Sequence, residues 1–444
     1  MTWIKKILEK GEAYAVGGSV RDELMGVPVN DLDILVCHIS SQDLEKILEN
    51  EGQLHLVGKN FGVYVFKPHG QKKSYEIALP RKEKSTGIGH KDFDVQVDHN
   101  IPIEDDLRRR DFTINAIAKN LRDDSLIDPW GGQQDIKNRV LRQVFDETFK
   151  EDPLRMLRAC QFVSRLDLEV EDNTFKGMCQ YASSVNTVSA ERIFHELEKL
   201  LKSKKPSLGF HLMHATGLLK EILPELQNTV GVKQPTKYHA YPVFEHILAV
   251  VDAAAAEPLS VRWAALCHDL GKPPSLAPHP KDGRPTFFGH EKISRDMAKS
   301  ILERLKAPEA LKKKVALLCQ EHMFLPANEL SDKALRRLIH RTGKDNIIEL
   351  IYLRRADKIG NGVDVNLDDW EKLLERVYAE LQGGSFSIKD LNLNGKDLIN
   401  KLQLKQGPQL GKTLDHLLNH VLENPELNKK DILLQLAKEF MSSK

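Results

Sequence analysis

Residues 13–36 read AYAVGGSVRDELMGVPVNDLDILV, in which two short apolar runs lie on either side of a glycine pair and a charged segment. The runs AYAV and DILV have the length and apolar content of buried strands. The segment between them predicts a short helix that begins at Ser19 and ends at Gly26, because serine is a common N-cap residue and glycine commonly follows a helix. We therefore expect this stretch to begin an α/β domain.

The glycine pair Gly17 and Gly18 lies where the first strand is expected to turn into the helix. Such a turn presents backbone N–H groups to an anion, and Arg21 in the first helical turn can add a charge-assisted contact. A plain tight turn is the alternative, and a glycine pair by itself favours it. Gly18 and Arg21 are candidates for binding a nucleotide phosphate.

Two carboxylates, Asp31 and Asp33, lie at the start of the second apolar run. Residues two apart in a strand point to the same face, so the two side chains converge. Paired carboxylates repel unless cations lie between them, and phosphoryl-transfer sites use such pairs to bind magnesium. A glycine pair, an arginine and this acidic pair within 17 residues predict a magnesium-dependent phosphoryl transfer in which Asp31 and Asp33 are catalytic.

Short apolar runs continue as far as residue 145, with VYVF at 63–66 and YEIAL at 75–79. From Asp152 onward, apolar residues recur at three- and four-residue spacing, as in PLRMLRACQFVSRL and AERIFHELEKLL, which predicts helices. Breaks rich in polar residues, proline or glycine interrupt this pattern; they lie at 204–206, at 232–238 and after Asp357. We therefore predict an α+β fold, with an α/β head and an all-α remainder, in four domains: 1–145, 146–230, 231–360 and 361–444.

The composition limits the possible partners and location. With 444 residues the chain is longer than a single hydrophobic core usually supports, so we expect several domains. Its 65 basic and 64 acidic residues leave a net charge of only +1, so any RNA-binding surface must be local. The N-terminal segment MTWIKKILEK is charged and no apolar run reaches 18 residues, so we expect a cytoplasmic protein without a membrane span.

Three basic clusters are candidates for such an RNA surface, although solvated helix faces are the commoner explanation of each. They are Lys202, Lys204 and Lys205; Lys312 to Lys314; and Arg336, Arg337 and Arg341. The cysteines are scattered and form no CxxC pair, so we expect them to be reduced core residues. They are Cys37, Cys160, Cys179, Cys267 and Cys319.

The segment GGSVRDELMGVPVNDLDILV (17–36) resembles the first motif of the class II tRNA nucleotidyltransferases, which are related to DNA polymerase beta. Four later segments resemble the next motifs of that family in order: RRRDFTINAIA (108–118), LIDPWGGQQDIKNRVLR (126–142), EDPLRMLRACQF (151–162) and SAERIFHELEKLL (189–201). The resemblance implies a polymerase-beta-like head with Mg²⁺ at Asp31 and Asp33. It also implies addition of CMP, CMP and AMP from CTP and ATP to the tRNA 3′ end without a nucleic-acid template.

Choosing a base without a template requires an acceptor and a multi-donor group in fixed geometry. Asp152 and Arg155 lie three apart at an expected helix start, so they share a face. The resemblance implies that they choose the base, that Arg158 assists them and that Arg110 reaches the phosphates or the ribose. The alternative is an ordinary capped helix with an Asp152–Arg155 ion pair. Gln161 departs from the family pattern, which has an arginine there, and this weakens the expected triphosphate contacts.

Two further segments bear on the product of the reaction. ALPRKEKSTGIGHKDFDVQVD (78–98) resembles the flexible loop required for adding the terminal adenosine, which enzymes that add only cytidines lack. Bacterial poly(A) polymerases of the family carry a GRRF-like element near residues 58–61, and Asn60 interrupts it here. We therefore expect CCA addition, and the first alternative is an A-adding partner of a separate CC-adding enzyme.

A second set of residues, His246, His268, Asp269 and Asp357, follows the order H, HD, D. Their mixed nitrogen and oxygen donors suit manganese, nickel, iron or magnesium, and a water acidified by the ion can attack a phosphate ester. Each histidine alone is more often a surface or core residue. With His290 and His322 between them, the set resembles an HD-family phosphohydrolase.

Some tRNA nucleotidyltransferases carry an HD module that hydrolyses 2′,3′-cyclic phosphates, 2′-nucleotides or other phosphomonoesters. The second alternative is accordingly an HD phosphohydrolase whose head only binds tRNA. After residue 361, LNLNGKDLI and the segment 407–425 resemble the family's helical tail, which the resemblance implies binds tRNA.

Overall fold

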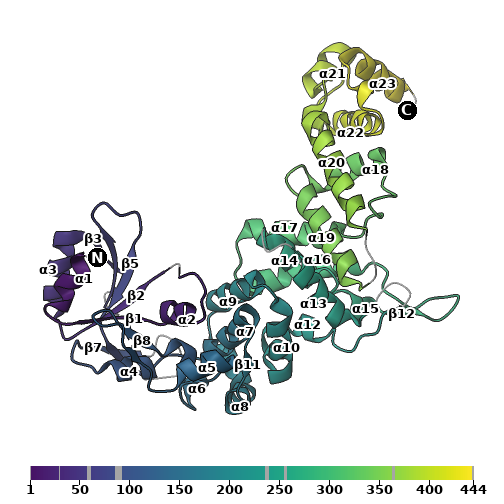
Figure 1. Cartoon of the computed structure of the whole chain (residues 1–444). Helices are drawn as coiled ribbons and strands as arrows, with labels where there is room; N and C mark the ends of the chain where they lie inside the picture. Colours follow the sequence, from purple (N-terminus) through teal and green to yellow (C-terminus); the bar gives the residue numbers. More distant parts are fainter. Residues whose placement is uncertain are drawn as a thin grey trace. The chain divides into compact units, whose positions relative to one another are not determined.

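A computed structural model describes residues 2–29, 31–57, 62–85, 93–235, 240–254, 258–362 and 366–442, with side chains left undescribed in 82–97 (Figure 1). The chain divides into two compact units, Met1–Pro224 and Glu225–Lys444. Within the described ranges, no helix is long and apolar enough to cross a membrane. The finer division into four domains stays a prediction.

The first unit is built on a mixed sheet whose strand order, among the described residues, is β3-β4-β5-β2-β1-β8-β9. Its central strands β1 and β2 are antiparallel and place Val16 opposite Asp33, whereas β2 and β5 are parallel and place Asp33 beside Glu76. The strands of this sheet are β1 (Glu12–Val16), β2 (Asp33–Cys37), β3 (Gly52–Val57), β4 (Val63–Pro68), β5 (Tyr75–Ala78), β8 (Ala118–Asn120) and β9 (Leu126–Ile127). A separate antiparallel pair is formed by β6 (Arg81–Ser85) and β7 (Phe93–Val97).

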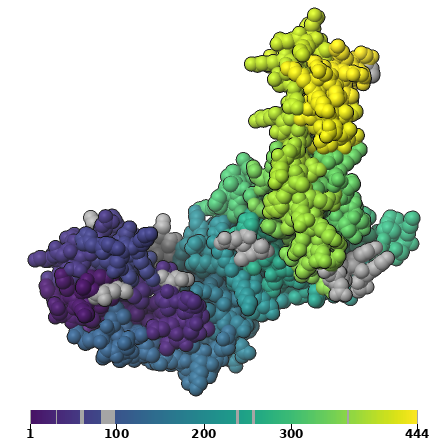
Figure 2. Space-filling model, turned by 45° about the horizontal axis from the view of Figure 1, so that its top comes forward, coloured from purple at the N-terminus to yellow at the C-terminus, as the bar shows by residue number. Residues whose placement is uncertain are grey.

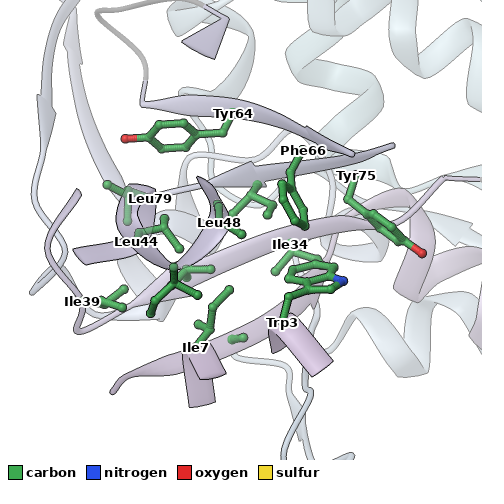
Figure 3. Close-up of a cluster of buried hydrophobic side chains, with 14 residues drawn as sticks. Trp3, Ile7, Ile34, Ile39, Leu44, Leu48, Tyr64, Phe66, Tyr75 and Leu79 are labelled. Atoms are coloured by element: carbon green, nitrogen blue, oxygen red, sulfur yellow. The ribbon is translucent and has the colours of Figure 1, made fainter. Parts of the chain in front are cut away.

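Both faces of the central strands are buried, which explains their nearly continuous apolar sequence. On one face, α1 (Thr2–Leu8) and α3 (Ser41–Glu51) cover the sheet, and Trp3 packs against Phe66 with ring centroids 5.0 Å apart (Figure 3). On the other face, Tyr14 and Leu35 pack against α4 (Ile103–Arg108). The strands predicted at 13–16, 33–36, 63–66 and 75–79 are confirmed.

The glycine turn differs in one detail from the sequence prediction. The helix α2 (Gly18–Leu24) begins at Gly18, after Gly17 with φ of 70°, and Ser19 is not its N-cap. The Ser19 hydroxyl instead donates to the carbonyl of Val16 at 3.0 Å. The left-handed glycine makes the turn itself, so no serine cap is needed.

The rest of the first unit is mainly helical, as predicted. The long helix α7 (Leu154–Leu166) packs against α9 (Ala190–Lys202) and α10 (Pro206–Thr216), so the break expected at 204–206 separates two helices. Its remaining helices are α5 (Gly132–Asn138), α6 (Thr148–Glu151), α8 (Asp172–Tyr181) and α11 (Leu218–Ile222), and α12 (Pro224–Gln227) contains the boundary of the two units.

In the second unit, five helices pack together: α13 (Val243–Ala253), α14 (Leu259–Cys267), α16 (His290–Arg304), α17 (Glu309–Glu321) and α19 (Ile347–Gly360). The other helices are α15 (Lys272–Ser275), α18 (Asp332–Thr342), α20 (Leu367–Gly383), α21 (Gly395–Leu402), α22 (Pro408–Glu423) and α23 (Lys430–Ser442). The last helices, yellow in Figure 2, pack against one another. A short strand pair, β12 (Ala277–Pro278) and β13 (Pro285–Thr286), precedes α16.

The cysteines are all free, as predicted, and four of them are buried. Cys179 is exposed on α8, so its assignment to the core is wrong.

We expect Gly209→Ala to destabilise the first unit by about 1–3 kcal/mol, the usual cost of overpacking. A methyl group there lies 2.6 Å from the carbonyl oxygen of Cys160 and 2.5 Å from Leu200. The matched control is Gly411→Ala in α22, where no atom lies within 4 Å and the helix should gain up to about 1 kcal/mol. Calorimetric unfolding of both variants checks this; a Gly209 variant as stable as the original chain would contradict the described packing of α10.

Candidate active sites

The first unit contains a cavity of about 860 Å³ between the glycine turn and the helices α7 and α9. All six predicted nucleotide-binding residues line it, together with Asp33 of the predicted catalytic pair. These are Gly18, Arg21, Asp33, Arg110, Asp152, Arg155 and Arg158. Asp31 lies exposed just before β2 and is not among the lining residues. The structure therefore brings the glycine turn, one acidic residue of the pair and the predicted base-choosing residues to one cavity.

A third carboxylate, which the sequence interpretation missed, lies beside the acidic end of β2. Glu76 on β5 lies in register with Asp33, so both side chains point to the same face of the sheet. Burial, with Glu76 and Asp31 nearby, raises the pKa of Asp33, although Arg110 opposes this. The site thus concentrates negative charge that a cation would relieve.

Two arginines form the wall of the cavity beside the glycine turn. A side chain on Gly17 would place its Cβ 2.6 Å from Nη1 of Arg110, and the φ of 70° at this residue favours glycine. Arg21 is buried, and it donates to Asp22 at 2.6 Å and to Asn115 at 2.6 Å. Burial lowers the pKa of both arginines. Arg21 is therefore a fixed positive group in the wall, held by its neighbours.

Asp152 and Arg155 do not pair with each other among the described contacts, so the alternative of an i,i+3 ion pair is wrong. Asp152 instead accepts from Arg192 on α9 at 2.8 Å and from the backbone N–H of Leu154 at 3.1 Å. Arg155 donates to the carbonyl of Arg109 at 2.5 Å. Arg192 belongs to the fifth motif, but no local spacing in the sequence connects it to Asp152.

A buried carboxylate, Asp111, orients Arg158. Arg158 donates to Asp111 at 2.7–2.8 Å, and its guanidinium lies 5.4 Å from the centroid of the Phe162 ring. Burial alone would raise the pKa of Asp111, but Arg158 and the hydrogen bond from Asn115 hold that pKa below its usual value. The sequence interpretation did not single out Asp111, although it belongs to the second motif.

Gln161 is buried in the cavity wall, at the position where an arginine was expected. Arg165, one helical turn further along α7, also lines the cavity, and its Nη2 lies 3.3 Å from Asp22. Arg165 therefore supplies a positive charge to the cavity from the same helix face as Gln161.

Two of the three basic clusters differ in what their side chains contact. Lys202 and Lys204 line the cavity of the first unit with Lys199. Arg336, in contrast, is buried and donates to the carbonyls of Leu422 and Glu423, so it joins α18 to the end of α22.

The second unit brings together the buried side chains His246, His268, Asp269 and Asp357, as predicted. Nε2 of His246 lies 3.2 Å from Asp269 Oδ2 and 3.2 Å from Asp357 Oδ1. Nε2 of His268 lies 3.3 Å from Asp269 Oδ2. His290 and His322 join the same cluster: with Asp269 they form one group of possible metal ligands, and His246, His268 and Asp357 form another. We call these six residues the His/Asp cluster.

Every histidine of the His/Asp cluster has Nδ1 within hydrogen-bond distance of a backbone carbonyl. The distances are 3.2 Å for His246 with Gly360, 2.8 Å for His268 with Ala265, 2.7 Å for His290 with Phe287 and 2.6 Å for His322 with Cys319. A carbonyl accepts, so Nδ1 is the protonated nitrogen and Nε2 points into the cluster. Metal-binding histidines commonly have this arrangement.

Electrostatics favours the metal-binding protonation state at three members of the cluster. Burial alone would lower the pKa of His246, but Asp269 and Asp357 raise it to about 9, which favours the protonated ring in the absence of a cation. Burial alone would raise the pKa of both aspartates. His268 and Lys272 nevertheless hold the pKa of Asp269 well below its usual value, and His246 and Arg354 do the same for the pKa of Asp357. Burial and neighbouring His268 lower the pKa of His322 to about 3, so this imidazole is neutral near pH 7. Deprotonated carboxylates and neutral imidazole are the forms that coordinate metals.

A cavity of about 520 Å³ opens beside the His/Asp cluster. Asp269, His290, His322 and Asp357 line it, together with the cationic residues Lys272, Arg284, Arg354 and Lys358. Phe288, which is 80% exposed, also lines it. Cations beside a candidate metal group suit an anionic phosphate substrate.

Comparison with known proteins places these sites in a family. The Poly A polymerase head domain model matches residues 13–142, the probable RNA and SrmB-binding site of polymerase A matches 167–229, and the putative tRNA nucleotidyltransferase domain 2 matches 286–437. The Multifunctional CCA protein of Aromatoleum aromaticum is 39% identical over 379 residues, which cover 83% of this chain and 87% of that protein. This chain belongs to the class II CCA-adding enzyme family.

Other members of the CCA-adding enzyme family match over most of their length. The Multifunctional CCA protein of Xylella fastidiosa is 32% identical over 421 residues, covering 91% of this chain and 94% of its own. The crystal structure of the Bacillus stearothermophilus CCA-adding enzyme in complex with CTP has a TM-score of 0.75 and 25% identity, covering 100% of this chain and 97% of that chain. The polymerase-beta-like α+β fold with a helical remainder is confirmed.

CCA-adding nucleotidyltransferases are metal-dependent, and this member of the family has candidate metal-binding groups. The two segments on which the predicted product depends lie wholly or partly outside the described residues. Asn60 lies in 58–61, and 86–92 form the middle of the loop predicted at 78–98. Only the paired strands β6 and β7 at the ends of that loop are described.

Proposed function

We propose that the chain is a CCA tRNA nucleotidyltransferase, which adds CMP, CMP and AMP from CTP and ATP to the 3′ end of tRNA and releases pyrophosphate. The observation that carries this proposal is a single cavity that combines an acidic strand end, a glycine turn and the Asp152 and Arg155 side chains. The similarity to Multifunctional CCA proteins along most of the chain supports it. A tRNA substrate also fits a cytoplasmic location.

The acidic pair Asp31 and Asp33 would hold Mg²⁺, with Glu76 beside them. Burial raises the pKa of Asp33, and the nearby carboxylates Glu76 and Asp31 raise it further, so this strand end suits a hard cation with oxygen ligands. When bound, Mg²⁺ supplies activation of the tRNA 3′ hydroxyl and charge stabilisation of the leaving pyrophosphate. Arg21, Arg110 and the backbone at Gly18 bind and orient the triphosphate.

The base is read by groups that other elements hold in place. Cytosine and adenine both present an exocyclic amine beside a ring nitrogen acceptor, whereas uracil and guanine present a carbonyl there. Asp152 accepts from the amine and Arg155 donates to the ring nitrogen, so one pair of side chains suits both CTP and ATP. Arg158, which Asp111 holds in place, lies on the same cavity-facing side of α7 as Arg155 and assists in binding the base.

The tRNA acceptor end has basic residues beside the cavity. Lys199, Lys202 and Lys204 on and after α9 line the cavity, where phosphates of the primer strand can approach. A Thermotoga maritima CCA-adding enzyme has been solved in complex with tRNA, and its fold is similar to this chain with a TM-score of 0.59 at 21% identity. We propose that the helices after residue 361 bind the tRNA body, and that β6 and β7 flank the loop needed for the terminal adenosine.

Incubation with tRNA that lacks all three terminal nucleotides should yield CMP, CMP and AMP incorporation from CTP and ATP. The Asp31→Ala, Asp33→Ala double variant should lose this activity by at least about 10³-fold, because its metal ligands are removed. Gel electrophoresis of labelled tRNA measures both. AMP addition to tRNA ending in CC, without CMP addition to the shorter tRNA, would instead establish the A-adding alternative.

Arg192→Ala should weaken base choice, because Asp152 loses the charge-assisted bond that fixes its carboxylate. Such a bond contributes about 1.5–3 kcal/mol, so we expect discrimination between CTP and UTP to fall roughly 10- to 100-fold. The ratio of kcat/KM values for CTP and UTP measures it, with Arg192→Lys restoring part of the loss. The control is Lys176→Ala on the exposed side of α8. An equal fall for CTP and UTP would show that Arg192 is merely structural.

We propose a phosphohydrolase activity as a second function, carried by the buried His/Asp cluster. His246, His268, Asp269 and Asp357 would hold a divalent transition metal such as nickel or manganese, which suits their nitrogen and oxygen donors. When bound, the metal supplies an acidified water. Lys272, Arg354 and Lys358 orient the phosphate of a 2′,3′-cyclic phosphate, a 2′-nucleotide or another phosphomonoester.

His268→Ala should abolish hydrolysis of 2′,3′-cyclic AMP and 2′-AMP and leave CMP and AMP addition within about twofold, because a ligand of only the second site is lost. Chelation should likewise remove hydrolysis, and added Ni²⁺ or Mn²⁺ should restore it. Phosphate release and tRNA extension are measured on the same preparations. If nucleotide addition survives the Asp31→Ala, Asp33→Ala change, the proposed head mechanism is wrong. Hydrolysis by the original chain without any nucleotide addition would instead establish the alternative of an HD phosphohydrolase whose head only binds tRNA.

A further inference from the structure

Two exposed apolar side chains line the cavity beside the His/Asp cluster. Phe288 is 80% exposed and Met323 is 56% exposed, and in the described part of the chain no other large hydrophobic residue is as exposed as these two. A single exposed apolar side chain is ordinary in a protein surface. Two of them in the wall of one cavity form an apolar surface that a bound ligand can cover.

The backbone around Phe288 is fixed, although its ring is exposed. Phe288 lies between α16 and the β12–β13 hairpin, which projects from the packed helices (Figure 1). The carbonyl of Phe287 accepts from the backbone N–H of His290 at 3.2 Å, and Gly289 is the left-handed N-cap of α16. The ring of Phe287 contacts Lys272, with Nζ 5.7 Å from the ring centroid. A ring on a backbone fixed in this way loses little entropy when a ligand stacks on it.

Met323 is held next to the candidate phosphate-binding residues. Nη1 of Arg354 lies 3.9 Å from Sδ of Met323, and Nη2 donates to the carbonyl of Phe324 at 3.1 Å. The same guanidinium pairs with Asp357 at 2.5 Å. One buried arginine therefore connects the apolar part of the cavity to the His/Asp cluster.

A buried acceptor in the same cavity has no donor. Asn361 is 4% exposed, and within the described residues its Oδ1 has no hydrogen-bond partner. Its backbone N–H donates to the carbonyl of Asp357 at 3.1 Å, so it lies one helical turn beyond a predicted metal ligand. A buried acceptor without a donor is unfavourable, and a ligand hydroxyl in the cavity would satisfy it.

We propose that the cavity is a nucleoside subsite of the second active site. Phe288 stacks on the base, Met323 contacts it, and Asn361 accepts from the free ribose hydroxyl next to the phosphate. The phosphate itself lies at Lys272 and Arg354. The cavity volume of about 520 Å³ falls within the range of about 300–1,000 Å³ that is usual for small-molecule sites.

The subsite narrows the substrate class of the proposed phosphohydrolase, on which the inference rests. It selects nucleoside phosphates over phosphomonoesters that have no base. Every base has an aromatic face, so stacking on Phe288 tolerates all four bases. The nucleoside phosphate can be a free nucleotide or the last nucleotide of an RNA.

The first test compares hydrolysis of 2′-AMP with that of glycerol 2-phosphate, which has no base. Phe288→Ala should lower kcat/KM for 2′-AMP roughly 10- to 100-fold, the usual effect of removing a stacked aromatic ring. The change should be mainly in KM, because stacking holds the bound substrate and the transition state equally, and glycerol 2-phosphate should change by less than about twofold. Phe288→Trp should keep the original preference.

The matched control is Leu276→Ala, just before β12, where the lost side chain is 51% exposed but does not line the cavity. It should leave both substrates unchanged. A short RNA that ends in a 2′-phosphate is measured beside 2′-AMP, and the larger kcat/KM of the two identifies the source of the nucleoside phosphate.

The second test separates the ribose contact from the base contact. Asn361→Ala should lower kcat/KM for 2′-AMP roughly fivefold, the usual effect of losing one hydrogen bond. Hydrolysis of 2′,3′-cyclic AMP should stay within about twofold, because neither ribose oxygen on its phosphate carries a proton to donate.

An unchanged preference for 2′-AMP over glycerol 2-phosphate in Phe288→Ala would overturn the subsite while leaving the phosphohydrolase intact. If the original chain hydrolyses neither compound, the proposed activity fails, and calorimetric titration with 2′-AMP decides the subsite. Saturating CTP occupies the proposed head site during this titration. Binding that Phe288→Ala loses would support the subsite, and equal binding by both chains would reject it.

Discussion

The antiparallel pairing of β1 with β2 is the constraint on which the head depends. Its register places Val16, the last residue before the glycine turn, opposite Asp33, the first residue of β2. The backbone proposed to bind a phosphate and the carboxylate proposed to bind a cation are therefore neighbours by strand pairing alone. The two faces of these strands pack against different sets of side chains, so a shift of one residue would place each apolar side chain in the wrong core cluster.

The helical part of the first unit fixes its functional side chains through partners on other elements. Arg192 of α9 holds Asp152, Asp111 holds Arg158, and the Arg109 carbonyl holds Arg155. Each contact restricts a long or rotatable side chain before a nucleotide arrives. A site that selects bases by side-chain hydrogen bonds gains from such preorganisation, since little entropy is lost on binding.

Much of this architecture could be predicted from local patterns, and the failures have two causes, distant contacts and one local turn. Strands such as 33–36 and helices such as α7 have apolar periodicities that persist in the fold. Glu76 was missed because its position beside Asp33 depends on the parallel pairing of distant strands. Asp152 was given the wrong possible partner because Arg192 approaches it from a helix 40 residues later. Ser19 was misassigned because a left-handed Gly17 makes the turn without a cap. Local sequence carries propensity, whereas the positions of Glu76 and Arg192 are tertiary and the conformation of Gly17 is a local alternative to a serine cap.

The ligands of the His/Asp cluster come from five helices or helix ends, between His246 in α13 and Asp357 in α19. Coordination of metal would therefore cross-link the second unit across most of its packed helices, and binding energy would become folding energy. The amount of intact protein in a cell would then follow the supply of a trace metal. Enzyme abundance and metal supply would then be linked through the two buried carboxylates of this cluster and their histidines.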